Sequence, residues 1–196
     1  MAVSQVPSTA PAARPVDVLI LSGSIRSDGY TGALTRYAAE SVLTAGHRPV
    51  LWDLGKDALP IADPAYHRDP AANPDPTVQR LVAAARRADA FLLATPVYHN
   101  SYSGVLKNAL DSLSMTEFTG KSVGLLAHGP KLTAVQACDH LRIVVRGLYG
   151  LCVPEQAVTT PGDYRTQESG AVQLGSDAMR IRVDGLVGAV GKLARR

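Results

Sequence analysis

The sequence has few aromatic residues, few cysteines and no long apolar run. Phe, Trp and Tyr make up 5% of the 196 residues, which argues against a surface that stacks the bases of single-stranded nucleic acid. The two cysteines, Cys138 and Cys152, form no CxxC pair, so we expect neither a disulfide framework nor a zinc site. No apolar run reaches the roughly 18 residues of a membrane span, and no signal peptide is recognisable. We therefore expect a cytoplasmic protein with reduced thiols.

The charge of the chain is modest and scattered. It has 20 Lys and Arg against 17 Asp and Glu, a net charge of +3, and its basic residues occur singly or in pairs. No basic stripe marks a nucleic-acid or membrane surface, so we expect neither partner. Hydrophobic residues form 46% of the chain, enough for one core. Residues 1–14, rich in Pro and Ala, are predicted to be a disordered arm, and residues 15–196 a single domain.

Short apolar runs alternate with helical patterns along the domain. Runs at 16–21, 90–95 and 122–127 are typical of strands buried on both faces, and 151–159 and, more weakly, 50–52 add two more. Amphipathic spacing predicts helices that end near Ala45, begin at Pro76, and cover 104–113, 132–148 and 177–193. The segment 55–76 holds five prolines and is predicted to be a long irregular loop.

Strand–helix alternation of this kind predicts an α/β fold. A five-stranded parallel sheet covered on both faces, the flavodoxin-like three-layer sandwich, fits the length. Ligands of such folds bind at the carboxyl ends of the strands, near the point where the strand order reverses. The loops after Leu21, Thr95 and Ala127 are therefore the places to look for function.

The first loop, residues 22–31, combines hydroxyl groups, glycines and one guanidinium at the start of a predicted helix. Free amides and a partial positive charge at a helix start favour a phosphate, and Arg26 adds a planar set of donors. The spacing matches neither a P-loop nor a GxGxxG motif. The alternative is an ordinary solvated loop with a capping serine.

The second loop, residues 95–104, offers a surface for a flat, electron-poor ring. Pro96, Val97 and Tyr98 could form the apolar face, and the backbone around Tyr98, His99 and Asn100 could supply amide donors. An acid–base role for His99 is less favoured, because no carboxylate is adjacent to it.

Two further features have alternative interpretations. Gly129, after the third strand, either allows close backbone approach to a ligand or forms a plain turn. Lys107 and Asp111 form either a helix-surface ion pair or a subunit contact.

Together the loops resemble the NADPH-dependent FMN reductase family. Gly23-Ser24-Ile25-Arg26 follows the first strand, and the stretch from Thr95 to Asp111 is similar to the family signature TPxYxxSxxGxLKNxxD. The resemblance extends over residues 16–193. It is strongest to the branch of sulfonate-linked flavin reductases, and azoreductase and quinone reductase members are also similar.

The resemblance implies an oxidoreductase that passes hydride from NADPH or NADH to FMN. The electrons would go on to a partner flavin-dependent monooxygenase, as reduced flavin, or to a quinone or azo acceptor. The family is homodimeric or homotetrameric, with the helix from Gly104 at the contact. No catalytic side chain and no metal are implied. Ser24, Arg26 and Thr31 would hold the FMN phosphate; Pro96, Val97, Tyr98, His99, Asn100 and Ser101 would line the isoalloxazine; and Gly129 would pass close to the ring.

Two alternatives and two departures accompany this interpretation. A flavin-binding electron carrier is disfavoured by the +3 charge and by Arg26, and a flavin-free protein on the same fold is the third possibility. Many family members have Ser at Gly29 and Gly at Pro130, so a hydroxyl and an N–H are missing here. Tyr102 aligns with a tyrosine of a π-helical distortion in the sulfonate-linked branch, but is more simply a core or interface residue.

Overall fold

A computed structural model describes residues 14–196 of the chain. The predicted arm, 1–14, lies outside the described residues except for Arg14. The Arg14 guanidinium forms an ion pair with Asp89 at 2.9 Å.

Five parallel strands form the central sheet, as predicted. They are β1 (Asp17–Ser22), β2 (Arg48–Asp53), β3 (Ala90–Pro96), β4 (Ser122–His128) and β5 (Leu151–Thr159), in the order β2-β1-β3-β4-β5. The order reverses between β1 and β3, whose carboxyl-terminal ends are neighbours: Ser22, the last residue of β1, pairs with Ala94, two residues before the end of β3. The ends of these two strands therefore meet at the switch point of the sheet.

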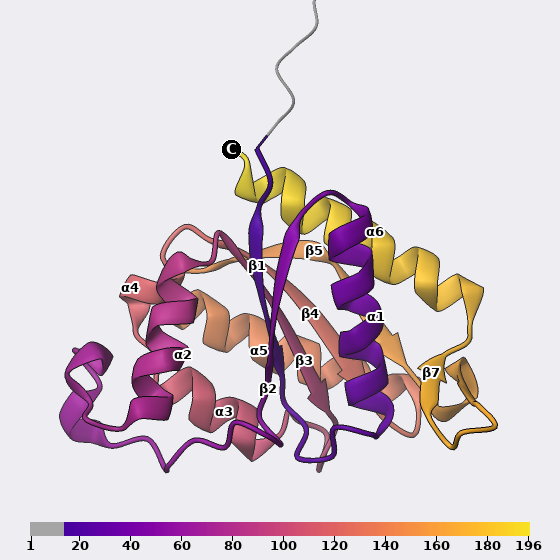
Figure 1. Cartoon of the computed structure of the whole chain (residues 1–196), viewed down its shortest axis with the longest axis horizontal. Helices are drawn as coiled ribbons and strands as arrows, with labels where there is room; N and C mark the ends of the chain where they lie inside the picture. The colour runs from indigo at the N-terminus through magenta and orange to yellow at the C-terminus, as the bar shows by residue number, and fades with distance from the viewer. Residues whose placement is uncertain (1–13) are drawn as a thin grey trace, which may run out of the picture.

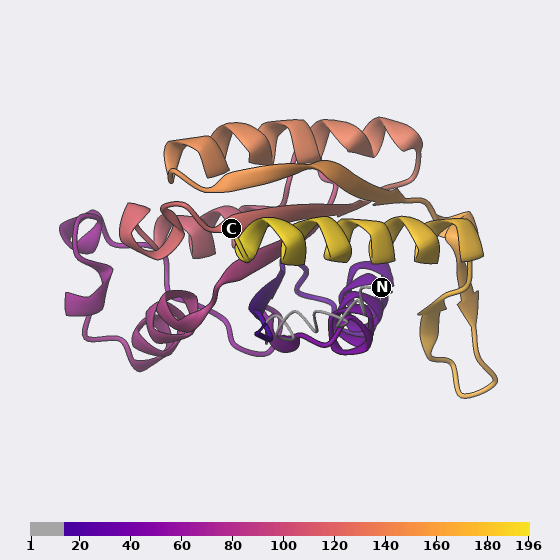
Figure 2. The same ribbon diagram turned by 90° about the horizontal axis from the view of Figure 1, so that it is seen from above.

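Helices cover both faces of the sheet, with β5 lying between α5 and α6 (Figures 1 and 2). One face carries α1 (Tyr30–Thr44) and α6 (Asp177–Ala194). The other face carries α2 (Pro76–Arg87), α3 (Gly104–Asp111), α4 (Met115–Phe118) and α5 (Val135–Gly147). Alternate residues of β1 enter the two cores, Leu19 and Leu21 on one side and Val18 and Ile20 on the other. Because both faces of the strand are buried, its sequence is a continuous apolar run.

Local signals in the sequence account for several helix ends. The Asp75 carboxylate accepts hydrogen bonds from the amides of Thr77 and Val78, and Pro76 occupies the first helical position of α2. Gly46 follows α1 with a φ of 78°, the left-handed conformation that glycine adopts without strain.

The segment between β5 and α6 contains a second, two-stranded sheet. A short 3₁₀ turn (Pro161–Asp163) leads into an antiparallel hairpin, β6 (Tyr164–Thr166) and β7 (Val172–Leu174), which packs beside α1 (Figure 1). Strands of three residues are too short to show a periodicity. The long loop 55–76 contains two 3₁₀ turns, Pro64–Tyr66 and Pro70–Ala72. Another, Leu132–Ala134, precedes α5.

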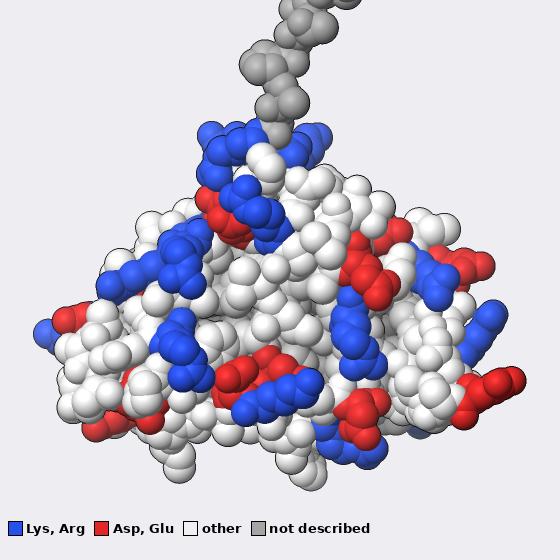
Figure 3. All heavy atoms as spheres, viewed as in Figure 1, with Lys and Arg blue, Asp and Glu red and all other residues white. Residues whose placement is uncertain are grey.

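Charges of both signs are interspersed on the face shown in Figure 3. None of the described helices is long and apolar enough to cross a membrane.

Candidate functional site

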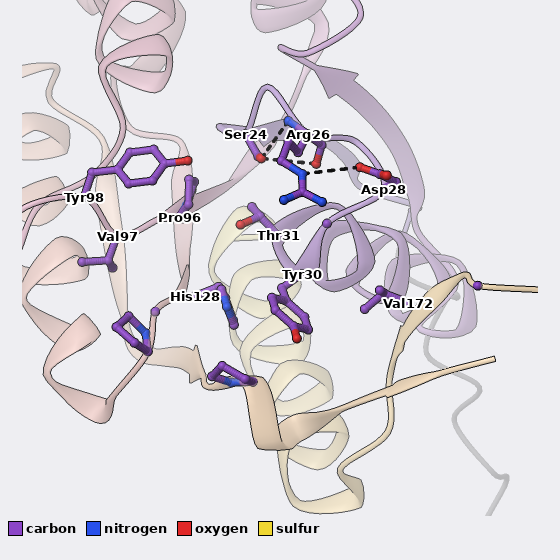
Figure 4. A pocket seen from close by; sticks show the side chains of 15 residues that line it. Ser24, Arg26, Asp28, Tyr30, Thr31, Pro96, Val97, Tyr98, His128 and Val172 are labelled. Atoms are coloured by element: carbon purple, nitrogen blue, oxygen red, sulfur yellow. Dashed lines mark hydrogen bonds and ion pairs between the residues drawn. The ribbon is translucent and has the colours of Figure 1, made fainter.

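An open basin of about 570 Å³ lies at the carboxyl ends of β1, β3 and β4 (Figure 4). This volume is within the range of about 300–1,000 Å³ usual for small-molecule sites. All three loops singled out in the sequence contribute to it, and the hairpin closes a fourth side. Its lining residues are Ser24, Arg26, Asp28, Gly29, Tyr30, Thr31, Pro96, Val97, Tyr98, His128, Gly129, Pro130, Pro161, Gly170 and Val172.

Buried hydrogen bonds fasten the start of the first loop to the second. The Gly23 amide donates to the Ala94 carbonyl at 2.8 Å, and the Ser103 hydroxyl donates to the Gly23 carbonyl at 2.6 Å. Ser103 is held in turn, because its amide donates to the Thr95 hydroxyl at 2.9 Å. A Cβ at Gly23 would lie 2.7 Å from the Ala94 oxygen and 2.9 Å from the Leu106 Cβ, so only glycine fits there.

The rest of the first loop turns its donors toward the basin. The Ser24 hydroxyl accepts a hydrogen bond from the Arg26 amide at 3.1 Å, which shapes the loop ahead of α1. Gly29 is the N-cap of α1 and supplies no side-chain bond to it, so the amides at the helix start, around Tyr30 and Thr31, lack a side-chain cap. Uncapped amides and the helix dipole attract an anion.

One carboxylate accompanies the guanidinium of this loop. Arg26 Nε lies 3.9 Å from Asp28 Oδ1, and both side chains are largely in water. Asp28 was not among the candidate residues predicted from the sequence. In Figure 4, the Arg26 side chain extends toward Thr31 while Asp28 lies on its far side.

The second loop contains a tight two-residue turn. The amides of Tyr98 and Ser101 donate to each other's carbonyls, both at 3.0 Å. The central residues, His99 and Asn100, have φ values of 49° and 63°, a conformation that is uncommon for residues other than glycine. Backbone held in this way is found preferentially at ligand sites.

Residues of the second loop divide between the basin and the turn. Pro96, Val97 and Tyr98 line the basin, and the Tyr98 side chain reaches toward it (Figure 4). The remaining three predicted residues lie in the turn and are not among the lining residues. The Ser101 hydroxyl is 3.0 Å from His140 Nδ1 on α5, which directs it away from the basin. The flavin contacts assigned to His99, Asn100 and Ser101 stay predictions.

The third wall is built around Gly129. Its amide donates to the Thr159 carbonyl at 3.1 Å, and a Cβ there would lie 2.7 Å from the Ala134 Cβ and 3.3 Å from the Val97 Cβ. Only glycine therefore allows the chain to pass this close to Val97. Because its amide already donates to Thr159, Gly129 lets a ligand approach closely but has no free N–H to offer it.

His128, which no sequence pattern pointed to, lines the basin next to Gly129. Its Nδ1 is 3.2 Å from the Thr159 hydroxyl, which lies 2.7 Å from the Tyr164 hydroxyl. Burial lowers the pKa of His128 to about 4, so the imidazole is neutral at neutral pH. It contributes polarity without positive charge.

An aromatic cluster joins three walls of the basin. The ring of Tyr30 lies 4.6 Å from that of His128 and 4.8 Å from that of Tyr164, between centroids. These residues come from the start of α1, the end of β4 and the start of β6. Burial raises the pKa of Tyr164, which keeps its hydroxyl protonated. Sequence patterns gave no signal for the cluster, although Tyr30 and His128 each adjoin a residue that was singled out.

Arg36 connects the hairpin to the first loop. Its Nη1 donates to the Ser27 carbonyl at 2.8 Å and its Nη2 to the Val172 carbonyl at 3.0 Å. One exposed side chain thus ties the hairpin to the first loop where the two meet at the edge of the basin. Gly32 makes room for this arrangement, because a Cβ there would lie 2.0 Å from the Ser27 oxygen.

The remaining motif residues have structural roles. Lys107 and Asp111 form the predicted i, i+4 ion pair at 2.7 Å. Asn108 Nδ2 donates to the Pro60 carbonyl at 2.8 Å and its Oδ1 accepts from the Ala62 amide at 2.9 Å, which fixes the long loop to α3. Tyr102 is half-buried against the core that packs on α3.

Comparison with known proteins points to one family. The sequence model described as NADPH-dependent FMN reductase matches residues 16–164, so nearly all of the hairpin lies beyond the match. FMN-dependent NADPH-azoreductases of Staphylococcus aureus are 35% identical to this chain over 164 residues, 84% of this chain and 87% of theirs.

Solved structures share the fold. The apo form of an NADH:FMN oxidoreductase superposes with a TM-score of 0.69 at 25% identity, covering 91% of this chain and 88% of that one. A flavoenzyme NAD(P)H:(acceptor) oxidoreductase from Paracoccus denitrificans superposes with a TM-score of 0.71 over 91% and 97%. At 22% identity, the second likeness concerns the fold alone.

Proposed function

This chain belongs to the NADPH-dependent FMN reductase family, and we propose that the basin is where it holds FMN. The protein is an oxidoreductase that uses NAD(P)H to reduce FMN. When bound, FMN supplies the electron-transfer chemistry, so the chain itself needs only to bind and orient the reacting rings. Proximity is then its main contribution to the rate.

The observation that carries this placement is the convergence of three loops on one basin with the chemistry a flavin nucleotide needs. The uncapped start of α1, the hydroxyls of Ser24 and Thr31 and the Arg26 guanidinium suit a phosphate. Pro96 and Val97 offer an apolar surface beside the close approach at Gly129. These features fit the two ends of FMN.

The ring end of the proposed site is formed by the second loop. Tyr98 is 55% exposed and is free to cover a ring lying on Pro96 and Val97. The turn at His99, Asn100 and Ser101 would present its backbone to the polar edge of the ring. Its hydrogen-bonded, left-handed geometry keeps the amides of His99 and Asn100 in place before a ligand arrives, while the Ser101 amide closes the turn.

For the electron acceptor, we propose an azo compound or a quinone. The relatives at 35% identity are named FMN-dependent NADPH-azoreductases, and their match covers most of both chains. Delivery of reduced flavin to a monooxygenase is the competing outcome of the assay below.

We further propose that the protein is a cytoplasmic homodimer or homotetramer. Ile143 on α5, Tyr149 and Leu151 are large apolar side chains that are about half exposed or more, and they lie close together in the chain, from α5 to the start of β5. Cys138 and Cys152 are free thiols, which suits a reducing compartment. Light scattering of the purified protein tests the assembly.

The test of function combines flavin binding with turnover. Purified protein is titrated with FMN, and NADPH and NADH oxidation is then followed alone, with free FMN, with a quinone and with an azo dye. We expect FMN binding and NADPH oxidation that accelerates with the dye or quinone. Turnover that depends only on free FMN would favour delivery of reduced flavin instead. Failure to bind any flavin would refute the proposed site.

Arg26 provides a sharper test of where the phosphate lies. Arg26→Gln should weaken FMN binding about five- to tenfold and leave riboflavin binding unchanged, because only FMN carries the phosphate. Arg87→Gln, which removes an exposed guanidinium at the end of α2, is the matched control. Equal weakening of both flavins by Arg26→Gln would remove Arg26 from the phosphate site.

A further inference from the structure

The two charged side chains that line the basin have opposite signs. Among the described residues, its lining includes one cation, Arg26, and one anion, Asp28. Their side chains are 78% and 86% exposed, and Nε and Oδ1 lie 3.9 Å apart (Figure 4). The end of the basin that faces the start of α1 therefore has no net side-chain charge.

Neighbouring groups do not restore a positive charge there. Arg36 borders the same part of the molecule, but its guanidinium is engaged by the Ser27 and Val172 carbonyls. His128 is neutral at neutral pH. A phosphate at this end of the basin would therefore be attracted by neutral hydroxyls, by the amides at the start of α1 and by the Arg26 guanidinium, which has the Asp28 carboxylate beside it.

We propose that Asp28 is a specificity-determining residue that limits the affinity for the FMN phosphate, so that the site discriminates less strongly between FMN and riboflavin. The inference rests on the proposed flavin site. A phosphate at the start of α1 must share Arg26 with the Asp28 carboxylate and is repelled by it. Riboflavin has no phosphate and meets neither effect. Asp28 thus reduces the preference that a phosphate site would otherwise give to FMN.

The test compares flavin affinities of wild type and Asp28→Asn. The Asn side chain keeps the shape and removes the charge from an exposed loop, so the fold should be retained. We expect FMN to bind about three- to fivefold more tightly, the scale of an exposed charge interaction, and riboflavin to bind unchanged. The gain should shrink at high salt, because mobile ions screen exposed charges. Asp28→Ser should give the same direction.

A matched control removes a negative charge elsewhere. Glu155→Gln alters an exposed carboxylate on β5, outside the basin, and changes the net charge by the same amount. It should leave both affinities unaltered. Equal tightening of both flavins by Asp28→Asn, or no change in the FMN to riboflavin ratio, would overturn this inference and leave the flavin site standing. Absence of flavin binding by the wild type would overturn both.

Discussion

Removal of the Ser103 hydroxyl should weaken both the fold and flavin binding. This hydroxyl accepts a hydrogen bond from the Leu106 amide at 3.2 Å, capping α3, and donates to the buried Gly23 carbonyl at 2.6 Å. Loss of an N-cap costs about 1 kcal/mol, and a buried carbonyl left without a partner costs about 1–3 kcal/mol. We therefore expect Ser103→Ala to lower the free energy of unfolding by about 2–4 kcal/mol.

The same bond joins the first loop to the second, so its loss should also reach the basin. With the Gly23 carbonyl released, Ser24 and Arg26 are positioned less firmly, and FMN affinity should fall about three- to tenfold, in line with the loss of one oriented hydrogen bond. Urea denaturation measures the stability, and fluorescence titration measures the affinity.

Ser122→Ala is the matched control for this experiment. Ser122 is also a buried serine, but its hydroxyl donates to the Val190 carbonyl at 2.9 Å at the opposite end of β4. The Ser122→Ala variant should lose about 1 kcal/mol of unfolding free energy and bind FMN as tightly as wild type. A Ser103→Ala variant that is destabilised no more than Ser122→Ala, or that binds FMN as tightly as wild type, would refute the joining role of the Ser103 hydroxyl.

Two further predictions concern the other walls of the basin. Burial lowers the pKa of His128 from 6.5 to about 4, so its neutral form stabilises the fold above about pH 6.5 and up to about 3 kcal/mol is lost as the pH falls toward 4. His128→Asn should flatten this part of the stability–pH profile, measured by urea midpoints; an unchanged slope would contradict it. Arg36→Ala should expose the hairpin to limited proteolysis within residues 167–171 and weaken FMN binding, because the bonds to the Ser27 and Val172 carbonyls are lost. A hairpin as resistant as in the wild type would count against this bracing role.

The sheet and its helices could be predicted because their signals are strong and local. A strand buried on both faces, such as β3, needs an uninterrupted apolar run, and α2 carries Asp75 and Pro76 where a helix start requires them. Parallel topology then fixes the end of the sheet at which the three loops meet. The position of the basin thus followed from the strand pattern.

The features of the site that could not be predicted from the sequence depend on contacts between distant segments or on local geometry that no motif indicates. Nothing near Tyr30 or His128 in the sequence indicates that their rings meet Tyr164, because this contact forms only when the hairpin folds back. The turn at His99 and Asn100 adopts positive φ without glycine, which no turn motif announces. Asp28 resembles any solvated loop residue until its distance to Arg26 is known.

Different interactions fix the different walls of the basin, so we expect substitutions in them to affect stability and flavin affinity differently. The wall at Gly23 and Ser103 is fixed by buried hydrogen bonds continuous with the sheet, so a change there alters stability and affinity together. The opposite edge, with Asp28, Arg36 and the hairpin, is fixed mainly by exposed polar contacts. Exposed contacts contribute little to folding, so this edge can change charge or shape while the fold is retained. Nearly all of the hairpin lies beyond the family match, which ends at residue 164. We therefore expect flavin preference to be set at this edge and the fold to be set at the other.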